Sequence, residues 1–179
     1  EHQYNTIVLC EKSFASSGIE KLYFQDCHLK FQYKCFYNCP DLTSVVLNNS
    51  RVLIRKSAFE NSNIESFEFL NDKSSKCYNI CIPERAFKNC KKLQRLCFSN
   101  KCTYFENLSF EGCDNIKEIQ FDQLKLVERF CHFWNICDKL IFRFDQQMNN
   151  EIIKIFLTNN DPNFVINEKY YFGFPSCRY

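Results

Sequence analysis

A spacing of residues that returns about every 23 positions is the feature that most constrains this chain. From Phe36 to Leu47 the sequence reads Phe-x2-Cys-x2-Leu-x2-Val-x-Leu, and two further copies keep the same spacing. Two shorter copies have Ser in place of Cys, and one later copy is less regular. The residues that open the copies, here named the lead phenylalanines, are Phe14, Phe36, Phe59, Phe87, Phe110 and Phe133. They follow one another at intervals of 22, 23, 28, 23 and 23 residues.

Phenylalanine is concentrated in two columns of this repeat. The second column, at the end of each copy, consists of Phe24, Leu47, Phe69, Phe98, Phe121 and Phe144. Phe fills eleven of the twelve places in the two columns, which is more than half of the 20 Phe in the chain. Chance does not produce this. A repeat of this length cannot bury its apolar face alone, so the pattern predicts a solenoid in which stacked coils align equivalent side chains.

Short strands are predicted before the end of each copy. Leu22-Tyr23-Phe24 and Val45-Val46-Leu47 alternate in the way a half-buried strand does, with the outer members facing the core and the middle one facing out. A second apolar cluster before each lead phenylalanine forms the other side of the coil. We therefore expect a β-rich solenoid of five to six repeats of 22–28 residues, with a polar loop at Asn71–Asn79 in the longest one.

The two ends of the chain differ from the middle, and we divide the chain into three segments. Residues 1–13 are expected to be the remnant of a preceding repeat or an N-terminal cap, because "TIVLCEKSF" is similar to "VLIRKSAF". Residues 14–145 are the repeats. Residues 146–179 are expected to cap the array with a short helix over Glu151–Leu157 and a strand at Asn163–Asn167. The β-branched residues in "EIIKIFL" keep a strand there as the alternative.

The units "RKSAFENSNIESFEFL", "PERAFKNCKKLQRLCF" and "NLSFEGCDNIKEIQF" resemble leucine-rich repeats of the BspA type. The repeat of that family has the form A-F-x-x-C-x-x-L-x-x-I-x-L or -F. The resemblance implies a right-handed solenoid whose strands line one curved sheet. It also implies a role in protein binding or adhesion, since the family occurs in bacterial surface proteins and is expanded in parasitic protists.

The cysteines favour packing over metal binding. Cysteine or serine fills one column of the repeat, namely Ser17, Cys39, Ser62, Cys90, Cys113 and Cys137. A position that accepts either small residue is most simply a buried packing site. The spacing Cys-x3-Cys at Cys35 and at Cys77 is wrong for a zinc knuckle, and the chain has only 3 His, so we expect no metal and no cofactor. Unpaired thiols fit a reducing compartment slightly better, with the cell surface as the alternative.

Enzymatic activity is not expected. The pairs Cys27-His28 and Cys131-His132 invite comparison with thiol proteases, but neighbours on a strand point to opposite faces, which is poor geometry for a nucleophile and its base. The sequence contains no glycine-rich phosphate loop and no metalloprotease motif.

Charge and hydropathy argue against nucleic acids and membranes as partners. The formal net charge is +2, and basic residues such as Arg51, Arg55 and Lys56 are interpreted as solvated. No apolar run approaches the roughly 18 residues of a membrane helix.

The predicted partner surface is the outward side of the strands. Its central column is Tyr23, Val46, Glu68, Cys97, Gln120 and Arg143. One flanking column is Lys21, Ser44, Ser66, Arg95 and Glu118. The flanking column on the other margin is Gln25, Asn48, Ser99 and Asp122. Solenoid curvature makes extended concave sites for proteins, and Tyr and Arg are enriched at binding hot spots. We therefore expect a protein-interaction module, with an intracellular scaffold component of a larger assembly as the alternative.

Overall fold

A computed structural model describes residues 5–70, 80–98, 103–106, 108–121, 141–143, 165–167 and 170–172. Within these ranges the chain forms strands and turns and contains no helix. The strands are β1 (Thr6–Leu9), β2 (Lys21–Gln25), β3 (His28–Phe31), β4 (Ser44–Asn48), β5 (Arg51–Ile54), β6 (Ser66–Leu70) and β7 (Ile80–Ile82). They continue with β8 (Arg95–Phe98), β9 (Thr103–Phe105), β10 (Glu118–Phe121), β11 (Ile141–Arg143), β12 (Val165–Asn167) and β13 (Tyr170–Phe172).

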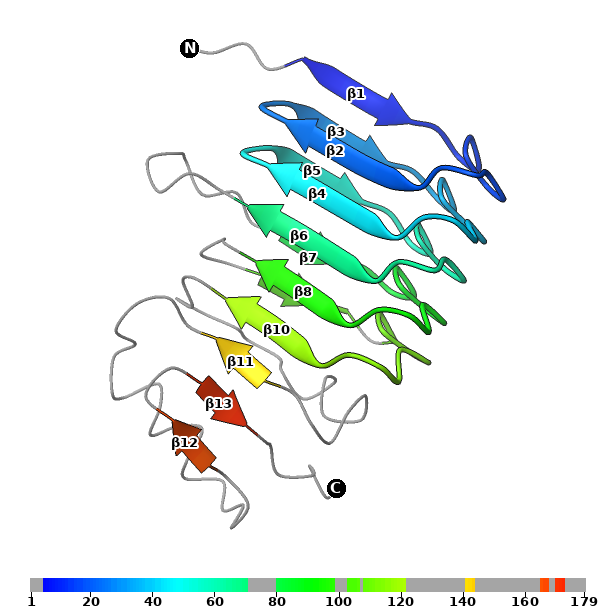
Figure 1. The fold of residues 1–179 in the computed structure, drawn as a ribbon. Helices are drawn as coiled ribbons and strands as arrows, with labels where there is room; N and C mark the ends of the chain where they lie inside the picture. Colours follow the sequence, from blue (N-terminus) through cyan, green and yellow to red (C-terminus); the bar gives the residue numbers. More distant parts are fainter. Residues whose placement is uncertain are drawn as a thin grey trace.

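The strands stack into the predicted solenoid (Figure 1). Sheet A contains β1-β3-β5, a two-stranded sheet contains β7-β9, and the eight-stranded sheet B has the order β12-β13-β11-β10-β8-β6-β4-β2. Neighbours from β2 to β11 pair in parallel, as successive turns of one coil must. In Figure 1 the chain runs leftward along each front strand and returns rightward behind it, and each successive front strand lies lower, which makes the coil right-handed.

The lead phenylalanines form the predicted ladder. Phe14, Phe36, Phe59, Phe87 and Phe110 stack face to face, with ring centroids 5.2, 5.6, 5.2 and 5.3 Å apart and ring planes within 11° of parallel. The last four of these side chains are at most 1% exposed. These distances between ring centroids lie in the range that aromatic pairs prefer. The ladder therefore adds favourable ring contacts to the free energy gained by burying apolar area.

The second column aligns as well, but its rings meet the opposite wall of the coil. The register pairs Leu47 with Phe69 and Phe69 with Phe98. Phe98 lies edge-on to Phe105 at 5.5 Å, and Phe24 lies edge-on to Phe31 of sheet A at 6.2 Å. The core therefore consists of one stacked ladder, with tilted rings joining the two walls.

The third side of each coil is a run of turns, here named the turn side, over 10–17, 32–39, 55–62, 83–90, and 106 with 108–113. Alternate backbone N–H groups close turns within the coil, as from Ser62 to the carbonyl of Phe59 at 3.2 Å. The N–H groups between them donate to the next coil, from Phe59 to Ala86 at 2.9 Å and from Asn61 to Lys88 at 2.8 Å. The turn side thus satisfies its backbone much as the sheets do.

In each coil, two residues of the turn side adopt positive φ. Two residues before the lead phenylalanine these are Lys12, Lys34, Ser57, Arg85 and Leu108. Two residues after it they are Ser16, Asn38, Asn61, Asn89 and Gly112. Asn and Gly tolerate this left-handed region best, and Asn89 also donates from its amide to Asn61 at 3.0 Å. The need for positive φ therefore explains why Asn and Gly occur two residues after the lead phenylalanines.

The cysteine or serine column has a hydrogen-bonding role as well as the predicted packing role. Cys39, Cys90 and Cys113 are fully buried, and each thiol donates to the carbonyl of the lead phenylalanine one coil earlier, at 3.1, 3.1 and 2.9 Å. Ser62 makes the equivalent bond to Phe36 at 2.6 Å. A small side chain with one S–H or O–H group meets both requirements, which explains why Cys and Ser alternate here.

The ends confirm one prediction and leave others open. The strand expected at Asn163–Asn167 is present as β12 over Val165–Asn167, whereas the helix expected over 151–157 lies outside the described residues. An additional strand, β13, was not predicted, and it pairs antiparallel with both β11 and β12. β1 pairs in parallel with β3, in the sheet A position of an earlier coil. The boundaries at residues 13 and 145 stay predictions.

Candidate binding surface

The outward side of sheet B, here named the strand face, brings the two predicted columns into rows. Register places Tyr23 beside Val46, Val46 beside Glu68, and Glu68 beside Cys97. The same row continues through Gln120 to Arg143. The flanking row runs in the same way through Lys21, Ser44, Ser66, Arg95 and Glu118.

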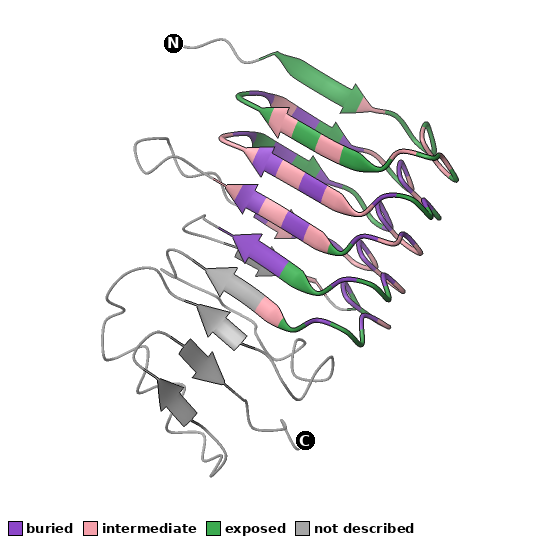
Figure 2. Cartoon of the chain, viewed as in Figure 1, coloured by how far each residue is buried: buried purple, intermediate pink, exposed green. Residues whose placement is uncertain are grey.

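Exposure differs along the central row, as the colours of Figure 2 indicate. Tyr23 is 62% exposed, and Val46 and Glu68 are half-buried. Of Gln120 and Arg143 only the backbone is described. The prediction that Cys97 points outward into solvent is wrong, because the residue is 3% exposed. Cys97 lies on β8, an interior strand of sheet B, in register with Glu68.

A chain of hydrogen bonds holds Tyr23 in place. Its hydroxyl donates to Gln25 Oε1 at 2.8 Å, and Gln25 Nε2 donates to Asp26 Oδ2 at 3.0 Å. The other carboxylate oxygen of Asp26 accepts from Asn49 Nδ2 in the next coil. Asp26 and Asn49 both have positive φ at the corner after β2 and β4. These contacts favour one orientation of an exposed aromatic ring, and such pre-organisation lowers the entropy cost of binding.

The charged side chains of the strand face on β6, β8 and β10 pair with one another. Arg95 lies between two carboxylates, with Nη1 3.3 Å from Glu68 Oε1 and Nε 3.9 Å from Glu118 Oε1. The three residues come from β6, β8 and β10, which are adjacent in sheet B. The Arg95 side chain is 46% exposed, whereas those of Glu68 and Glu118 are 21% and 19% exposed, so a partner would meet the guanidinium before the two acids.

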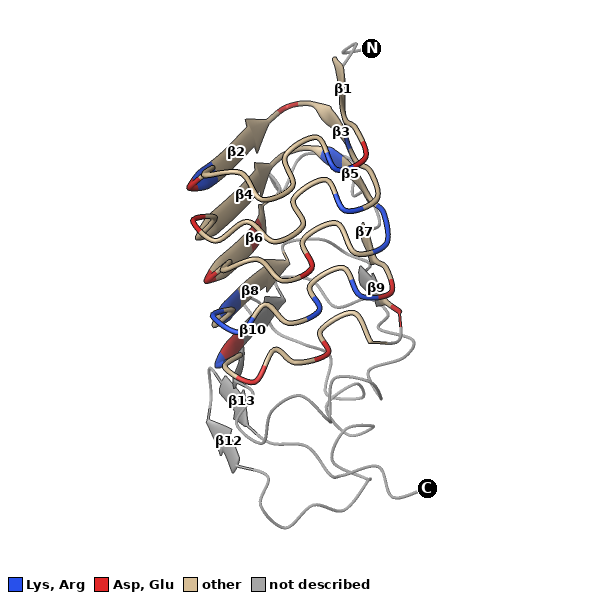
Figure 3. Cartoon of the chain, turned by 90° about the vertical axis from the view of Figure 1, so that its right-hand side faces the viewer, with Lys and Arg blue, Asp and Glu red and all other residues tan. Residues whose placement is uncertain are grey.

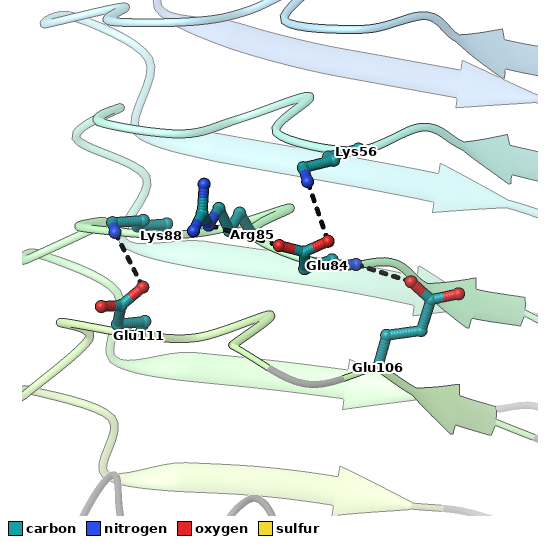
Figure 4. Close-up of polar contacts among 6 residues, drawn as sticks. All are labelled: Lys56, Glu84, Arg85, Lys88, Glu106 and Glu111. Carbon is teal, nitrogen blue, oxygen red and sulfur yellow. Dashed lines mark hydrogen bonds and ion pairs between the residues drawn. The ribbon is translucent and has the colours of Figure 1, made fainter.

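Ion pairs on the turn side join coils to one another (Figure 4). Lys56 Nζ lies 2.8 Å from Glu84 Oε2, and Lys88 Nζ lies 2.8 Å from Glu111 Oε2. The backbone N–H of Glu84 donates to Glu106 Oε2 at 2.9 Å. The Lys56 ammonium, through its hydrogen bond, holds the pKa of Glu84 below its usual value. These contacts link consecutive coils and belong to the scaffold.

The described cysteines are free thiols, and burial suppresses the ionisation of several of them. Desolvation raises the pKa of Cys35 to about 12. Desolvation, followed by the nearby Glu106 carboxylate, raises the pKa of Cys81 to about 11. Burial and the neighbouring Cys113 thiol raise the pKa of Cys90 well above its usual value. Since the thiolate is the reactive form, these three groups are poor nucleophiles.

Cys27 and His28, the pair considered for catalysis, lie where the chain enters β3. Cys27 is 5% exposed, and its Sγ is 3.5 Å from Ser50 Oγ. Among the residues with described positions, no three His, Cys, Asp or Glu side chains gather as a metal site would require. Nor does any described segment form a helix of the length and apolarity needed to cross a bilayer.

The fold and the two aligned columns define a leucine-rich repeat protein. The BspA type leucine rich repeat region matches residues 7–140 in 6 copies. The chain therefore belongs to the BspA-type leucine-rich repeat family, as the resemblance of its repeats indicated. No curated protein and no solved structure matches the chain.

The residues that position Tyr23 were not recognised from the sequence. Gln25 was assigned to the margin of the strand face, and Asp26 and Asn49 were given no role. One signal was available: Asp26 and Asn49 follow the ends of equivalent strands, and both residue types tolerate positive φ. Asp26 and Asn49 could thus have been recognised as a repeated corner.

Proposed function

We propose that this chain is a non-enzymatic protein-interaction module that presents its strand face to a protein partner. Family membership supports the coarse role, because repeat solenoids commonly bind proteins along their sheets. The observation that carries the proposal is Tyr23, a tyrosine 62% exposed on a rigid sheet and held by Gln25. Rigid aromatic side chains of this kind are typical binding hot spots.

The neighbours of Tyr23 favour a partner of mixed polarity. Val46 offers an aliphatic contact beside the ring, and Lys21 offers an exposed cation at the strand's start. Further along the face Arg95 bridges two carboxylates. A uniformly acidic or basic ligand would meet repulsion at one of these points, whereas a protein surface with an apolar centre and a polar rim would not. The concave shape expected for this face, and an adhesive role, are parts of the same proposal.

A photo-crosslinking experiment tests the binding role. A benzoylphenylalanine at position 23 or 46 is expected to form an adduct with one defined protein in extracts of the source cells. The matched control carries the same group at Lys92, an exposed site in the turn before β8 and outside the two rows of the strand face. Tyr23→Ala, introduced into the protein labelled at position 46, is expected to reduce the adduct at least about tenfold, as hot-spot truncations do. Equal labelling at positions 23 and 92 would contradict the proposal.

A second candidate is an intracellular scaffold component of a larger assembly. It is favoured by the first described coil, where Ile7 is 36% exposed and Leu9, Leu22 and Phe24 are only partly buried. The strands β1 and β2 are sheet edges at that end. Edges of this kind pair readily with other chains. Cross-links confined to β1 and β2, with none at position 23, would support this second candidate instead.

A further inference from the structure

The turn side of the second described coil carries two aromatic rings and a cation, a combination that the other described coils lack. The Lys34 ammonium lies 4.4 Å from the ring centroid of Tyr37 and 5.4 Å from that of Tyr33. Both distances are typical of a cation–π contact. Tyr33 is 37% exposed, and Lys34 and Tyr37 are half-buried. These three residues are here named the tyrosine–lysine cluster.

Backbone hydrogen bonds anchor the cluster to its own coil and to the coil before. The N–H of Lys12 donates to the carbonyl of Tyr33 at 3.2 Å. The N–H of Ser16 donates to the carbonyl of Tyr37 at 2.8 Å. Within the coil, the N–H of Tyr37 donates to the carbonyl of Lys34 at 3.1 Å. All three side chains therefore start from a backbone that is held in place, which lowers the entropy cost of binding.

Later coils use the positions of the two tyrosines for ion pairs between coils (Figure 4). Tyr33 lies three residues before its lead phenylalanine, and the same position holds Lys56 and Glu84 in the next two coils, which pair at 2.8 Å. The position directly after the lead phenylalanine holds Lys88 and Glu111, which also pair at 2.8 Å. The tyrosine–lysine cluster has no such pair, so it does not link coils in the way that these residues do.

The cluster presents hydrogen-bond donors without acceptors. Among the described residues, no carboxylate lies within ion-pair distance of Lys34, and neither phenol hydroxyl of the cluster has a hydrogen-bond partner. Lys12 and Ser57 take the place of Lys34 in the adjacent coils, so no acid occupies this column beside it. An ammonium and two phenol hydroxyls can all donate, and a carboxylate can only accept. The cluster therefore matches a carboxylate.

The surroundings of the cluster narrow the class of partner. Figure 3 views the turn side and shows both Lys or Arg and Asp or Glu along the coils. A nucleic acid needs a continuous basic track, and Glu60, which follows Tyr37 in its column, interrupts one. A sugar that stacked on either ring would compete with the Lys34 ammonium for a ring face. A protein side chain delivers a single carboxylate and avoids both problems.

We propose that the tyrosine–lysine cluster binds an Asp or Glu side chain of a protein partner, next to an aliphatic residue that packs against the tyrosine rings. The carboxylate accepts from Lys34 Nζ and from the phenol hydroxyls, while the cation–π contacts keep the ammonium in position. The cluster lies on the turn side, whereas Tyr23 lies on the strand face. This second site does not depend on the first, and the two proposals can fail separately.

Titration of the ¹⁵N-labelled protein with two matched peptides, followed by nuclear magnetic resonance, tests the proposal. The peptide N-acetyl-Leu-Asp-Leu-amide is expected to shift the amide signals of Tyr33, Lys34 and Tyr37 and to leave that of Lys92 in place. The analogue with Asn in place of Asp is expected to bind about fivefold more weakly, because it loses the ion pair. Equal binding of the two peptides would overturn the proposal.

Variants of the cluster separate its charge from its hydroxyl groups. Lys34→Gln is expected to weaken binding of the Asp peptide about fivefold. Lys92→Gln, the matched control, changes net charge equally at an exposed lysine in the turn before β8 and is expected to bind like the wild type. The double variant Tyr33→Phe, Tyr37→Phe keeps both rings and is expected to weaken binding about threefold. Equal losses in the two lysine variants would show a dependence on net charge alone and would overturn the site.

Further measurements distinguish other partners and the strand face. Tighter binding of oligouridylate or sialic acid than of the Asp peptide would assign the cluster to a different partner class and overturn the proposal. Tyr23→Ala is expected to leave binding of the Asp peptide unchanged, and a loss in this variant would place the peptide on the strand face instead. Circular dichroism checks folding, and if Lys34→Gln does not fold, the peptide pair on the wild type and the double tyrosine variant decide the result.

Discussion

The first described coil and the interior coils use the same residue types in the same columns, but they bury them to different extents (Figure 2). Phe87 is 0% exposed and stacks on Phe59 at 5.2 Å and on Phe110 at 5.3 Å. Phe14 occupies the equivalent place, is only partly buried, and stacks on Phe36 at 5.2 Å. Residues in the same column of a solenoid therefore contribute different amounts to the free energy of folding, depending on the coil in which they lie.

The difference follows from how such a fold is held together. Each coil buries little within itself and much against its neighbours, so stability is close to a sum of interfaces between coils. An interior residue takes part in two interfaces, and a residue of the first described coil takes part in one. On the turn side each coil donates backbone hydrogen bonds to the next one, as Phe36 does to Ala58 and Phe59 does to Ala86. An interior coil is therefore hydrogen-bonded to both of its neighbours.

The largest expected effect is on the ring ladder. Phe87→Ala is expected to lower the free energy of unfolding by about 3–5 kcal/mol, the usual range for a buried core aromatic. Phe14→Ala is expected to cost only about 1–2 kcal/mol, because one face of its ring has no stacking partner among the described residues. Urea denaturation of both variants measures the two losses. Equal losses would contradict the comparison, and a loss below about 1 kcal/mol for Phe87→Ala would contradict the ladder itself.

The cysteine and serine column gives the next effect. Cys90→Ala is expected to cost about 1–3 kcal/mol, because the carbonyl of Phe59 loses its thiol donor inside the core. Cys90→Ser is the matched control and is expected to cost less than about 1 kcal/mol, since Ser62 already makes the same contact to Phe36. In the first coil Ser17→Ala is expected to cost less than Cys90→Ala. If Cys90→Ser were as destabilising as Cys90→Ala, packing alone would explain the column.

A smaller effect is expected at Gly112, which has φ of +73°. A Cβ on this residue would lie 2.5 Å from Asn89 Oδ1, on the side chain of the preceding coil. Gly112→Ala is expected to cost about 1–2 kcal/mol through left-handed strain together with this contact. The double variant Gly112→Ala, Asn89→Ala removes the contact and keeps the strain. Thermal unfolding of both is expected to show a combined cost smaller than the sum of the two single costs, and simple additivity would exclude the contact.

The repeat and its core could be predicted because buried columns leave a periodic record in the sequence. Phe59 and Cys90 are recognisable since equivalent neighbours impose the same requirement every coil. The positive φ at Lys12 and Leu108 could not be predicted in this way, because neither residue type favours that region and the coil geometry enforces it. Burial of Cys97 also escaped the sequence, since alternation gives direction but not the size of neighbouring side chains.

The candidate surfaces were predictable to different degrees. The rows of the strand face follow from the period alone, and the register confirms the alignment of Tyr23 with Val46. Whether these residues bind a partner stays a prediction. The outer positions of sheet A were given no role from the sequence, because Lys30 and Leu53 belong to different coils. Only the pairing of β3 with β5 brings them to one side of the molecule.

The smallest expected effect concerns ion pairs between coils. Lys56–Glu84 joins two coils at 2.8 Å, whereas Lys12–Glu11 at 3.5 Å joins neighbours within the first coil. The pKa of Glu84 is lowered on folding, so its pair stabilises the protein above the usual Glu pKa and is lost as pH falls through the lowered value. Glu84→Gln is therefore expected to shift the urea midpoint slightly downward at neutral pH, with no shift once Glu84 is protonated in the folded wild type. Glu11→Gln, the control within one coil, is expected to show no shift at either pH. Equal shifts would mean that solvent screens both pairs alike, and that the advantage of interior coils lies entirely in packing and backbone hydrogen bonds.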